Sequence, residues 1–397
     1  MPLAVYVLGL AIFAQGTSEM MLAGLLPQMS ADLGVSVPDA GLLISAFAVG
    51  MLVGAPVLAV LTLRWPHRRS LLAFLALFAL MHAAGALTPG YGVLFATRVA
   101  AAFVYAGFWA VAAAAAIGLV PANARGRAMG IVAGGLTLAT VLGLPAGTVL
   151  GQHLGWRAVF WAVALMSLAA MAGVAATVKG GRPDEAAPRL RAELRAMARR
   201  RLWLSYATTS LAMAALMVIF SYLGAMLEDA TGIPERWVPA VLALYGAGSL
   251  IGIAFGGRIA DTRPMATLYG GIAGLVVVSV ALALTLGSPV PAAVLVFLLG
   301  LFGFGINPAL NSRVFALSDA SRTLVAATST SAFNVGITVG PWLGGLALGA
   351  GAGYSATAWI GAGLGVAALA VVAVGHERRP VPRESEARVT AEAAVDA

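Results

Sequence analysis

Residues 91–119 read YGVLFATRVAAAFVYAGFWAVAAAAAIGL, an apolar run with a single charged side chain, Arg98. A helix that crosses the hydrocarbon core of a bilayer needs about 20 mainly apolar residues, and this run is longer than that. It lacks the alternation of polar and apolar residues that a transmembrane β-strand requires. The run therefore predicts a membrane-spanning helix that carries one arginine.

Eleven further runs of the same kind predict an all-α integral membrane protein with twelve transmembrane helices. The expected spans are 3–25, 39–62, 70–88, 91–119, 128–150, 157–178, 202–226, 237–257, 264–287, 289–311, 323–349 and 354–374. The whole chain of 397 residues is 60% hydrophobic and only 10% charged, with a mean hydropathy of +0.93. A soluble domain carries roughly 25% charged residues. This composition excludes a cytosolic enzyme, a disordered chain and a nucleic-acid binder.

Several chemistries are also excluded by residue counts. The chain has no cysteine, so it forms no disulfide and no thiolate site. Its one lysine, Lys179, is not part of the Gly-Lys-Ser/Thr sequence of a phosphate-binding loop. The four histidines are scattered, and no Ser/His/Asp set shares a depth in the spans. We therefore expect no metal, no cofactor and no enzymatic activity.

The basic residues predict the topology. Of the 24 Lys and Arg residues, 21 fall in loops on one side of the twelve spans, or in the tail on that side. Only Arg157 and Arg236 fall on the other side, and Arg98 lies inside a span. Positive charge marks the cytoplasmic loops of membrane proteins. We expect a multi-pass protein of the plasma membrane, with both termini in the cytoplasm.

A repeat divides the chain into two halves. Gly50 and Gly54 recur as Gly248 and Gly252 at an offset of 198 residues. Parallel repeats of this kind are typical of transporters built from two bundles. We therefore predict six-helix bundles at 1–178 and 202–375, joined by a basic cytoplasmic linker at 179–201 and followed by a disordered tail at 376–397.

Glycine and proline cluster in the fifth and eleventh spans. Small residues let membrane helices approach closely, and proline interrupts the backbone hydrogen bonds of a helix. Two such clusters at matching places in the repeat indicate a hinge between bundles that move. The hinge residues that we expect are Gly143, Pro145, Gly147, Gly336, Gly340 and Pro341.

Charged residues follow the second and eighth spans at the cytoplasmic side. Arginines and an acid at a helix end can form ion pairs in one conformation and lose them in another. The expected gating residues are Arg64, Arg68, Arg258, Asp261 and Arg263.

Three ionisable residues lie inside spans, where a charge is costly and marks a functional site by default. At about 1.5 Å per residue, Glu19 lies about 9 Å and Arg98 about 10 Å from the outer end of its span. His82 lies at a similar depth, and a structural role is its simpler interpretation. Glu19 and Arg98 could therefore pair if their helices are neighbours.

These motifs together resemble the major facilitator superfamily, and within it the twelve-span drug/proton antiporters. The loops after spans 2 and 8 look like a motif of that superfamily, and 143–151 looks like its antiporter motif. Residues 14–19 and 24–27, AQGTSE and GLLP, look like the chloramphenicol-efflux branch of actinobacteria. In one departure, Leu63 stands where the family usually has an acid. The resemblance implies that spans 1 and 4 are neighbours and that Arg98 takes part in proton coupling.

Polar and aromatic side chains inside the spans predict a binding cavity, because an amide in hydrocarbon needs a partner or water. The cavity residues that we expect are Gln15, Thr17, Tyr105, Trp109, Asn307, Asn311 and Asn334. With Glu19 and Arg98 as the proton-coupling pair, we expect a monomeric secondary transporter that exports a small amphiphilic drug, chloramphenicol by resemblance. The alternatives are an exporter of a sugar or another small metabolite, and a receptor or scaffold that transports nothing.

Overall fold

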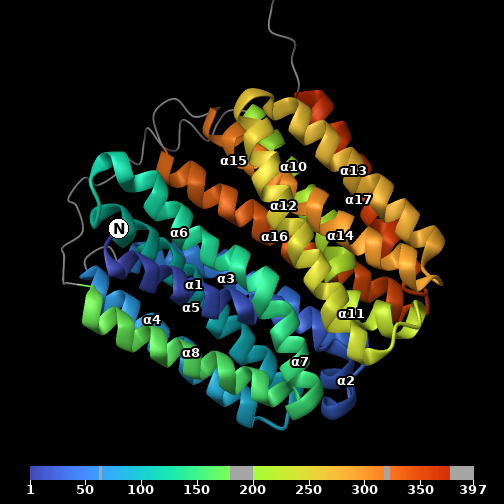
Figure 1. Ribbon diagram of the computed structural model, residues 1–397, viewed down its shortest axis with the longest axis horizontal. Helices are drawn as coiled ribbons and strands as arrows, with labels where there is room; N and C mark the ends of the chain where they lie inside the picture. Colours follow the sequence, from blue (N-terminus) through green and yellow to red (C-terminus); the bar gives the residue numbers. More distant parts are fainter. Residues whose placement is uncertain (62–64, 179–199, 317–321, 376–397) are drawn as a thin grey trace, which may run out of the picture.

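The structure is a computed structural model that describes residues 1–61, 65–178, 200–316 and 322–375. Within these ranges, twelve helical segments are long and apolar enough to cross a membrane, which confirms the predicted spans. Figure 1 shows two groups of helices side by side, one blue to green and one yellow-green to red. The linker predicted at 179–201, apart from Arg200 and Arg201, and the tail predicted at 376–397 lie outside the described residues.

The first half forms six spans from shorter helical segments. These are α1 (Leu3–Met20), η1 (Met21–Gly24), α2 (Leu26–Leu33), α3 (Val37–Leu61), α4 (His67–Leu87), α5 (Tyr91–Gly118), η2 (Ala122–Ala124), α6 (Arg125–Leu138), η3 (Ala139–Gly143), α7 (Leu144–Leu154) and α8 (Trp156–Thr177). The second half repeats the plan. Its segments are α10 (Arg200–Phe220), α11 (Leu223–Ala225), η4 (Met226–Ala230), η5 (Glu235–Trp237), α12 (Val238–Thr262), α13 (Pro264–Thr285), α14 (Pro289–Gly305), α15 (Asn307–Ala316), α16 (Arg322–Gly349) and α17 (Ser355–Gly375).

Two spans are interrupted where proline removes a backbone donor. In the fifth span, the π-helical turn η3 separates α6 from α7, and Pro145 follows it in the first turn of α7. In the tenth span, α14 ends at Gly305 and α15 begins at Asn307, just before Pro308. Because proline has no N–H and its ring clashes with the preceding turn, a regular α-helix cannot continue unchanged through either position. Both breaks border the space between the two halves.

The repeated glycines hold equivalent helices together in each half. A Cβ at Gly50 would collide with the carbonyl oxygen of Val99, and one at Gly248 with that of Phe297. These partners are themselves 198 residues apart, so α3 meets α5 as α12 meets α14. Close backbone approach through small residues replaces the hydrophobic effect as the source of helix association in lipid.

The spans of both halves end on two sides of the molecule. We call the side whose loops are rich in arginine the basic side, and the other the far side. The basic side carries Arg68, whose Nη2 donates to the carbonyl of Ala175 at the end of α8. The far side carries Arg157 at the start of the same helix. Across the seam, Ser45 of α3 donates to the carbonyl of Thr338 of α16 at 2.9 Å.

Candidate functional site: a cavity between the two halves

A cavity of about 310 Å³ lies between the halves. Its lining residues come from α1, α3, α5 and α6 on one side and from α10, α14, α15 and α16 on the other, and they are mostly apolar or aromatic. They are Glu19, Met20, Ile44, Met51, Tyr105, Trp109, Leu136, Met213, Met217, Phe220, Phe304, Asn307, Asn311, Thr330, Phe333, Asn334 and Ile337. Glu19 is the one charged side chain in this lining. The cavity suits an amphiphilic molecule with a large apolar part.

The structure places five of the seven residues predicted for the cavity in its lining: Tyr105, Trp109, Asn307, Asn311 and Asn334. Gln15 and Thr17 are not among the lining residues. Gln15 is fully buried, with its Nε2 donating to the carbonyl of Ala11 at 3.4 Å. The hydroxyl of Thr17 donates to the carbonyl of Phe13 at 2.8 Å, one turn back along its own helix.

Sequence reasoning missed the methionines of the lining, together with Phe220 and Phe333. Apolar residues in a membrane span can face lipid, a neighbouring helix or a cavity, and no pattern in the sequence separates these three environments. The unbranched thioether of methionine adapts to ligands of different shape. The missed residues therefore contribute a large share of the apolar residues that line the cavity.

Glu19 faces the cavity from the last turn of α1. Its side chain is partly exposed, and among the described residues it makes no hydrogen bond or ion pair. Arg98 lies close enough for the two charges to interact, but the direct ion pair considered in the sequence analysis does not form. Glu19 is therefore a titratable group at the surface of the cavity with a buried guanidinium nearby.

Arg98 is held by other groups. It is 1% exposed on α5, and its Nη1 donates to Ser18 Oγ at 2.7 Å while its Nη2 donates to the Ser18 carbonyl at 3.1 Å. The guanidinium lies over the ring of Phe47, 4.2 Å from its centroid. Hydrogen bonds and a cation–π contact together offset part of the cost of burying the charge.

His82 continues this network behind Ser18. Its Nε2 is 2.6 Å from Ser18 Oγ, and its Nδ1 is 2.8 Å from the carbonyl oxygen of Phe78. The imidazole packs between the rings of Phe78 and Phe160, at centroid distances of 4.2 and 5.6 Å. His82 is therefore part of the Arg98 site, although it does not line the cavity.

The predicted hinge residues lie beside the seam, but their glycines pack within their own halves. A Cβ at Gly143 would collide with Thr17 of α1, and one at Gly340 would lie 2.8 Å from the carbonyl of Ala214 on α10. Gly147 and Gly336 make similar contacts, with Met21 and with Ser210. Pro341 is also held within its own half. The carbonyl of Pro341 accepts a hydrogen bond from Tyr222 at 2.8 Å.

The predicted gating residues lie at the basic side. Arg64 is outside the described residues, and Arg68 binds Ala175 as given above. Arg258, Asp261 and Arg263 are exposed at the end of α12, and within the described ranges they form no ion pair. In this conformation the basic side is therefore not closed by these charges.

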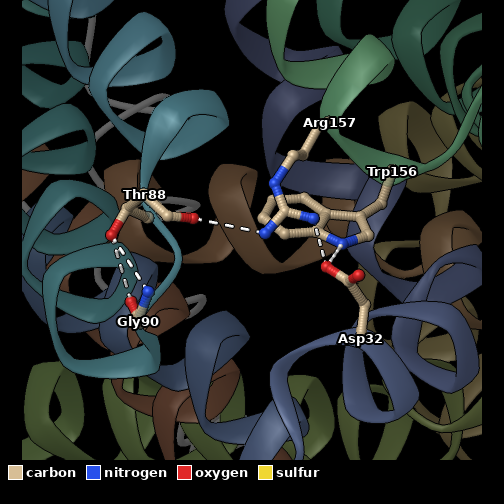
Figure 2. Close-up of polar contacts among 5 residues, drawn as sticks. All are labelled: Asp32, Thr88, Gly90, Trp156 and Arg157. Carbon is tan, nitrogen blue, oxygen red and sulfur yellow. Dashed lines mark hydrogen bonds and ion pairs between the residues drawn. The ribbon is translucent and has the colours of Figure 1, made fainter.

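The far side of the first half is tied together by Asp32 of α2 (Figure 2). This carboxylate accepts hydrogen bonds from Trp156 Nε1, at 2.9 Å, and from Arg157, with which it also forms an ion pair. Arg157 Nη2 reaches the carbonyl of Thr88 at 3.3 Å, beyond the end of α4. The hydrogen bond from Arg157, followed by that from Trp156, lowers the pKa of Asp32 below its ordinary value.

The far side also holds contacts between the halves. Tyr222 is fully buried, and a Cβ at Gly41 of α3 would collide with its ring and hydroxyl. Gln152 Nε2 donates to the carbonyl of Glu235 at 2.7 Å, and Gln28 Nε2 to the carboxylate of Glu235 at 3.4 Å. The cavity reaches the other way, to Asn311, which is exposed. Among the described residues, contacts between the halves close the far side, and the cavity extends toward the basic side.

Comparison with known proteins agrees with this architecture. The family model described as Major Facilitator Superfamily matches residues 8–323. This chain belongs to that superfamily. It is a multi-pass membrane transporter and not an enzyme.

Among its relatives, the chloramphenicol resistance protein of Streptomyces lividans is 44% identical over 376 residues, covering 94% of this chain and 95% of that protein. The inner membrane transport protein YdhP of Escherichia coli (strain K12) is 32% identical, covering 94% of this chain and 96% of its own length. Among solved structures, a bacterial homolog of the human lysosomal transporter Spinster matches with a TM-score of 0.71 at 16% identity. The peptide transporter POT matches with 0.74 at 13%, and each comparison covers 94% of both chains. At such identities the structures show the fold alone.

Proposed function

We propose that this transporter exports a small amphiphilic drug in exchange for protons, with chloramphenicol as the first substrate to test. The observation that carries the proposal is the cavity between the halves, where Glu19 is the one carboxylate in a mostly apolar and aromatic lining that also holds three asparagine amides. A drug with a ring and a polar end fits such a surface. The 44% identical relative named as a chloramphenicol resistance protein supports this choice of substrate.

Glu19 is the proposed proton carrier, and Arg98 is its modulator. A carboxyl group that faces the cavity gains or loses a proton according to the side to which the cavity opens. Drug that enters from the cytoplasm displaces the proton, either by contacting Glu19 or by excluding water from it. Because chloramphenicol is neutral, each proton that enters moves charge inward, so both the pH gradient and the membrane potential drive export.

Alternating access follows from the arrangement of the halves. Contacts at Tyr222 and Glu235 close the far side, while the cavity reaches the basic side. We propose that the basic side is cytoplasmic, with both termini there, and that the protein works as a monomer in the plasma membrane. Separation of the far-side contacts and closure of the exposed ends near Asp261 would expose the same cavity to the outside.

Accumulation of labelled chloramphenicol in an exporter-deficient host tests the proposal. Cells that make the protein should accumulate less drug than cells without it, and a protonophore should remove the difference. Glu19→Gln should also remove it, whereas Glu228→Gln, the same change on the far side outside the cavity, should not. Export that persists with the protonophore would reject proton coupling, and absence of drug export with active export of a sugar would favour the metabolite alternative.

A further inference from the structure

The hydrogen bonds around His82 have only one consistent direction. The carbonyl oxygen of Phe78 can only accept, so the imidazole Nδ1, at 2.8 Å, carries a proton. The guanidinium of Arg98 can only donate, so Ser18 Oγ accepts from it at 2.7 Å. The remaining hydroxyl hydrogen of Ser18 points to His82 Nε2 at 2.6 Å, which must accept it. Arg98, Ser18, His82 and the Phe78 carbonyl thus form a chain in which every link donates the same way.

This direction requires a neutral imidazole. If His82 were protonated on both nitrogens, Ser18 Oγ would face two cationic donors, and its own hydrogen would have no acceptor among the described residues. The charged group nearest to His82 is Arg98 of α5, which also opposes a second positive charge. Two further titratable groups border the partners of His82: Tyr105 of α5 lies 6.2 Å from the Phe78 ring, and Glu19 of α1 interacts with Arg98, while α8 contributes the ring of Phe160.

The same series of hydrogen bonds also determines which groups Arg98 binds. Ser18 presents two oxygens to the guanidinium, its hydroxyl and its carbonyl, and Phe47 covers one face. Glu19 is the next residue along α1, yet it receives no hydrogen bond from Arg98. The Nε of Arg98 is buried with no partner in the described part of the chain. The guanidinium thus keeps a donor that is unused in this conformation, and the Glu19 carboxylate, with which it interacts, is an acceptor of opposite charge.

We propose that His82 is a positioning residue for proton coupling: it fixes the Ser18 hydroxyl as an acceptor for Arg98 and so keeps Arg98 away from Glu19. Rotation of the Ser18 hydroxyl would turn its hydrogen toward the guanidinium and repel it. The imidazole prevents that rotation by binding the hydrogen on its Nε2. The role rests on the proposed function of Glu19, but the hydrogen-bond chain itself does not.

Proton release on addition of chloramphenicol to purified protein in weak buffer tests the proposal. In His82→Leu, the freed Arg98 should stabilise the Glu19 carboxylate, so half-maximal release should occur at a lower pH than in wild type. His82→Gln keeps an acceptor for Ser18 and should return the midpoint toward the wild-type value. Ser18→Ala removes the same link and should shift the midpoint in the same direction. The shifts of Ser18→Ala and His82→Leu should not add.

The imidazole ¹⁵N signals provide a readout that does not depend on transport. His82 should stay in the neutral form protonated on Nδ1 from pH 5 to 9, and Ser18→Ala should change the Nε2 signal. Titration of His82 within that range would contradict the hydrogen-bond direction that requires a neutral imidazole. An unchanged release midpoint in His82→Leu would overturn the positioning role, and complete loss of release in His82→Gln would make His82 the carrier itself. Wild-type protein that releases no protons on drug binding would reject the proposed function. The ¹⁵N signals would still test the direction of the hydrogen bonds from Arg98 through Ser18 to His82.

Discussion

At the repeat offset of 198 residues, Arg98 of α5 corresponds to Val296 of α14, and Phe47 corresponds to Tyr245. In the first half, a guanidinium lies over the ring of Phe47. In the second half, Val296 is fully buried, and the ring of Tyr245 stacks on Phe220 with centroids 4.7 Å apart. The glycine contacts around these positions are the same in both halves. The backbone plan is therefore shared, while among the described residues Glu19 and Arg98, the charges far from the ends of a span, belong to the first half.

Under the proposed function, this difference gives separate tasks to the two walls of the cavity. The first half contributes Glu19, with Arg98 and His82 behind it. The second half contributes the amides of Asn307, Asn311 and Asn334 among aromatic and methionine side chains. We infer that proton exchange is concentrated in the first half, and that the second half mainly contributes to the affinity for the drug.

The largest effect should come from exchanging the residues that distinguish the halves. Val296→Arg places a guanidinium where the partners of Arg98 are missing, and such a charge at the bilayer centre costs about 2.5–3.5 kcal/mol on insertion scales. We expect little folded protein in the membrane. Arg98→Val should fold, because it gives the first half the side chain of the second, but its proton release should lose the wild-type pH dependence. Membrane yield and release curves measure the two effects, and abundant folded Val296→Arg protein would contradict the comparison.

Neutral substitutions on the two cavity walls should separate coupling from affinity. Glu19→Gln mimics the protonated carboxyl group, so drug binding should survive while gradient-driven export is lost. Asn334→Ala removes an amide, and loss of one hydrogen bond at about 1 kcal/mol should weaken binding by roughly fivefold. Its coupling to protons should remain. Binding and export assays in vesicles compare the two, and loss of coupling in Asn334→Ala would reject the division of tasks.

Substitutions at equivalent glycines of the two halves should destabilise the protein by similar amounts. Gly50→Val and Gly248→Val each push a side chain into the backbone of the facing helix, and overpacking of this kind costs about 1–3 kcal/mol. The two variants should lower the unfolding temperature by similar amounts. Gly130→Val is the matched control, because a Cβ there meets no atom within 4 Å. Damage in only one half would show that the repeat is not energetically equivalent.

The membrane spans could be predicted from the sequence, whereas the contacts of the site could not. The twelve spans and the glycine repeat were predictable because length, hydropathy and offset are properties of the chain itself. The depths of Glu19 and Arg98 followed from helical rise, but their partners did not. Whether Arg98 meets Ser18 or Glu19 depends on the rotation of α1 and on side-chain rotamers. Thr17 shows the same limit, since its hydroxyl binds its own helix instead of facing the cavity.

The smallest effect concerns the far side, where the halves carry acids with opposite pH responses. Asp32 of the first half is paired with Arg157, and its pKa is lowered. Glu228 of the second half has a pKa raised from 4.5 to about 7 by burial first, and then by Glu235 and Asp229. A lowered pKa stabilises the folded state above the ordinary value and loses this contribution only when the pH falls below it. A raised pKa stabilises the folded state at low pH and loses its contribution as the pH rises to about 7.

Between pH 5 and 8, therefore, Glu228 and not Asp32 is the far-side acid whose titration should change the stability of the purified protein. Its unfolding temperature should fall as the pH rises through this window, and Glu228→Gln should flatten that slope. Asp32→Asn should leave the slope unchanged and lower the unfolding temperature slightly throughout, because an exposed ion pair contributes about 1 kcal/mol or less. A slope that disappears in Asp32→Asn would mean that the ion pair of the first half, and not the crowded acids of the second, governs the pH response of the far side.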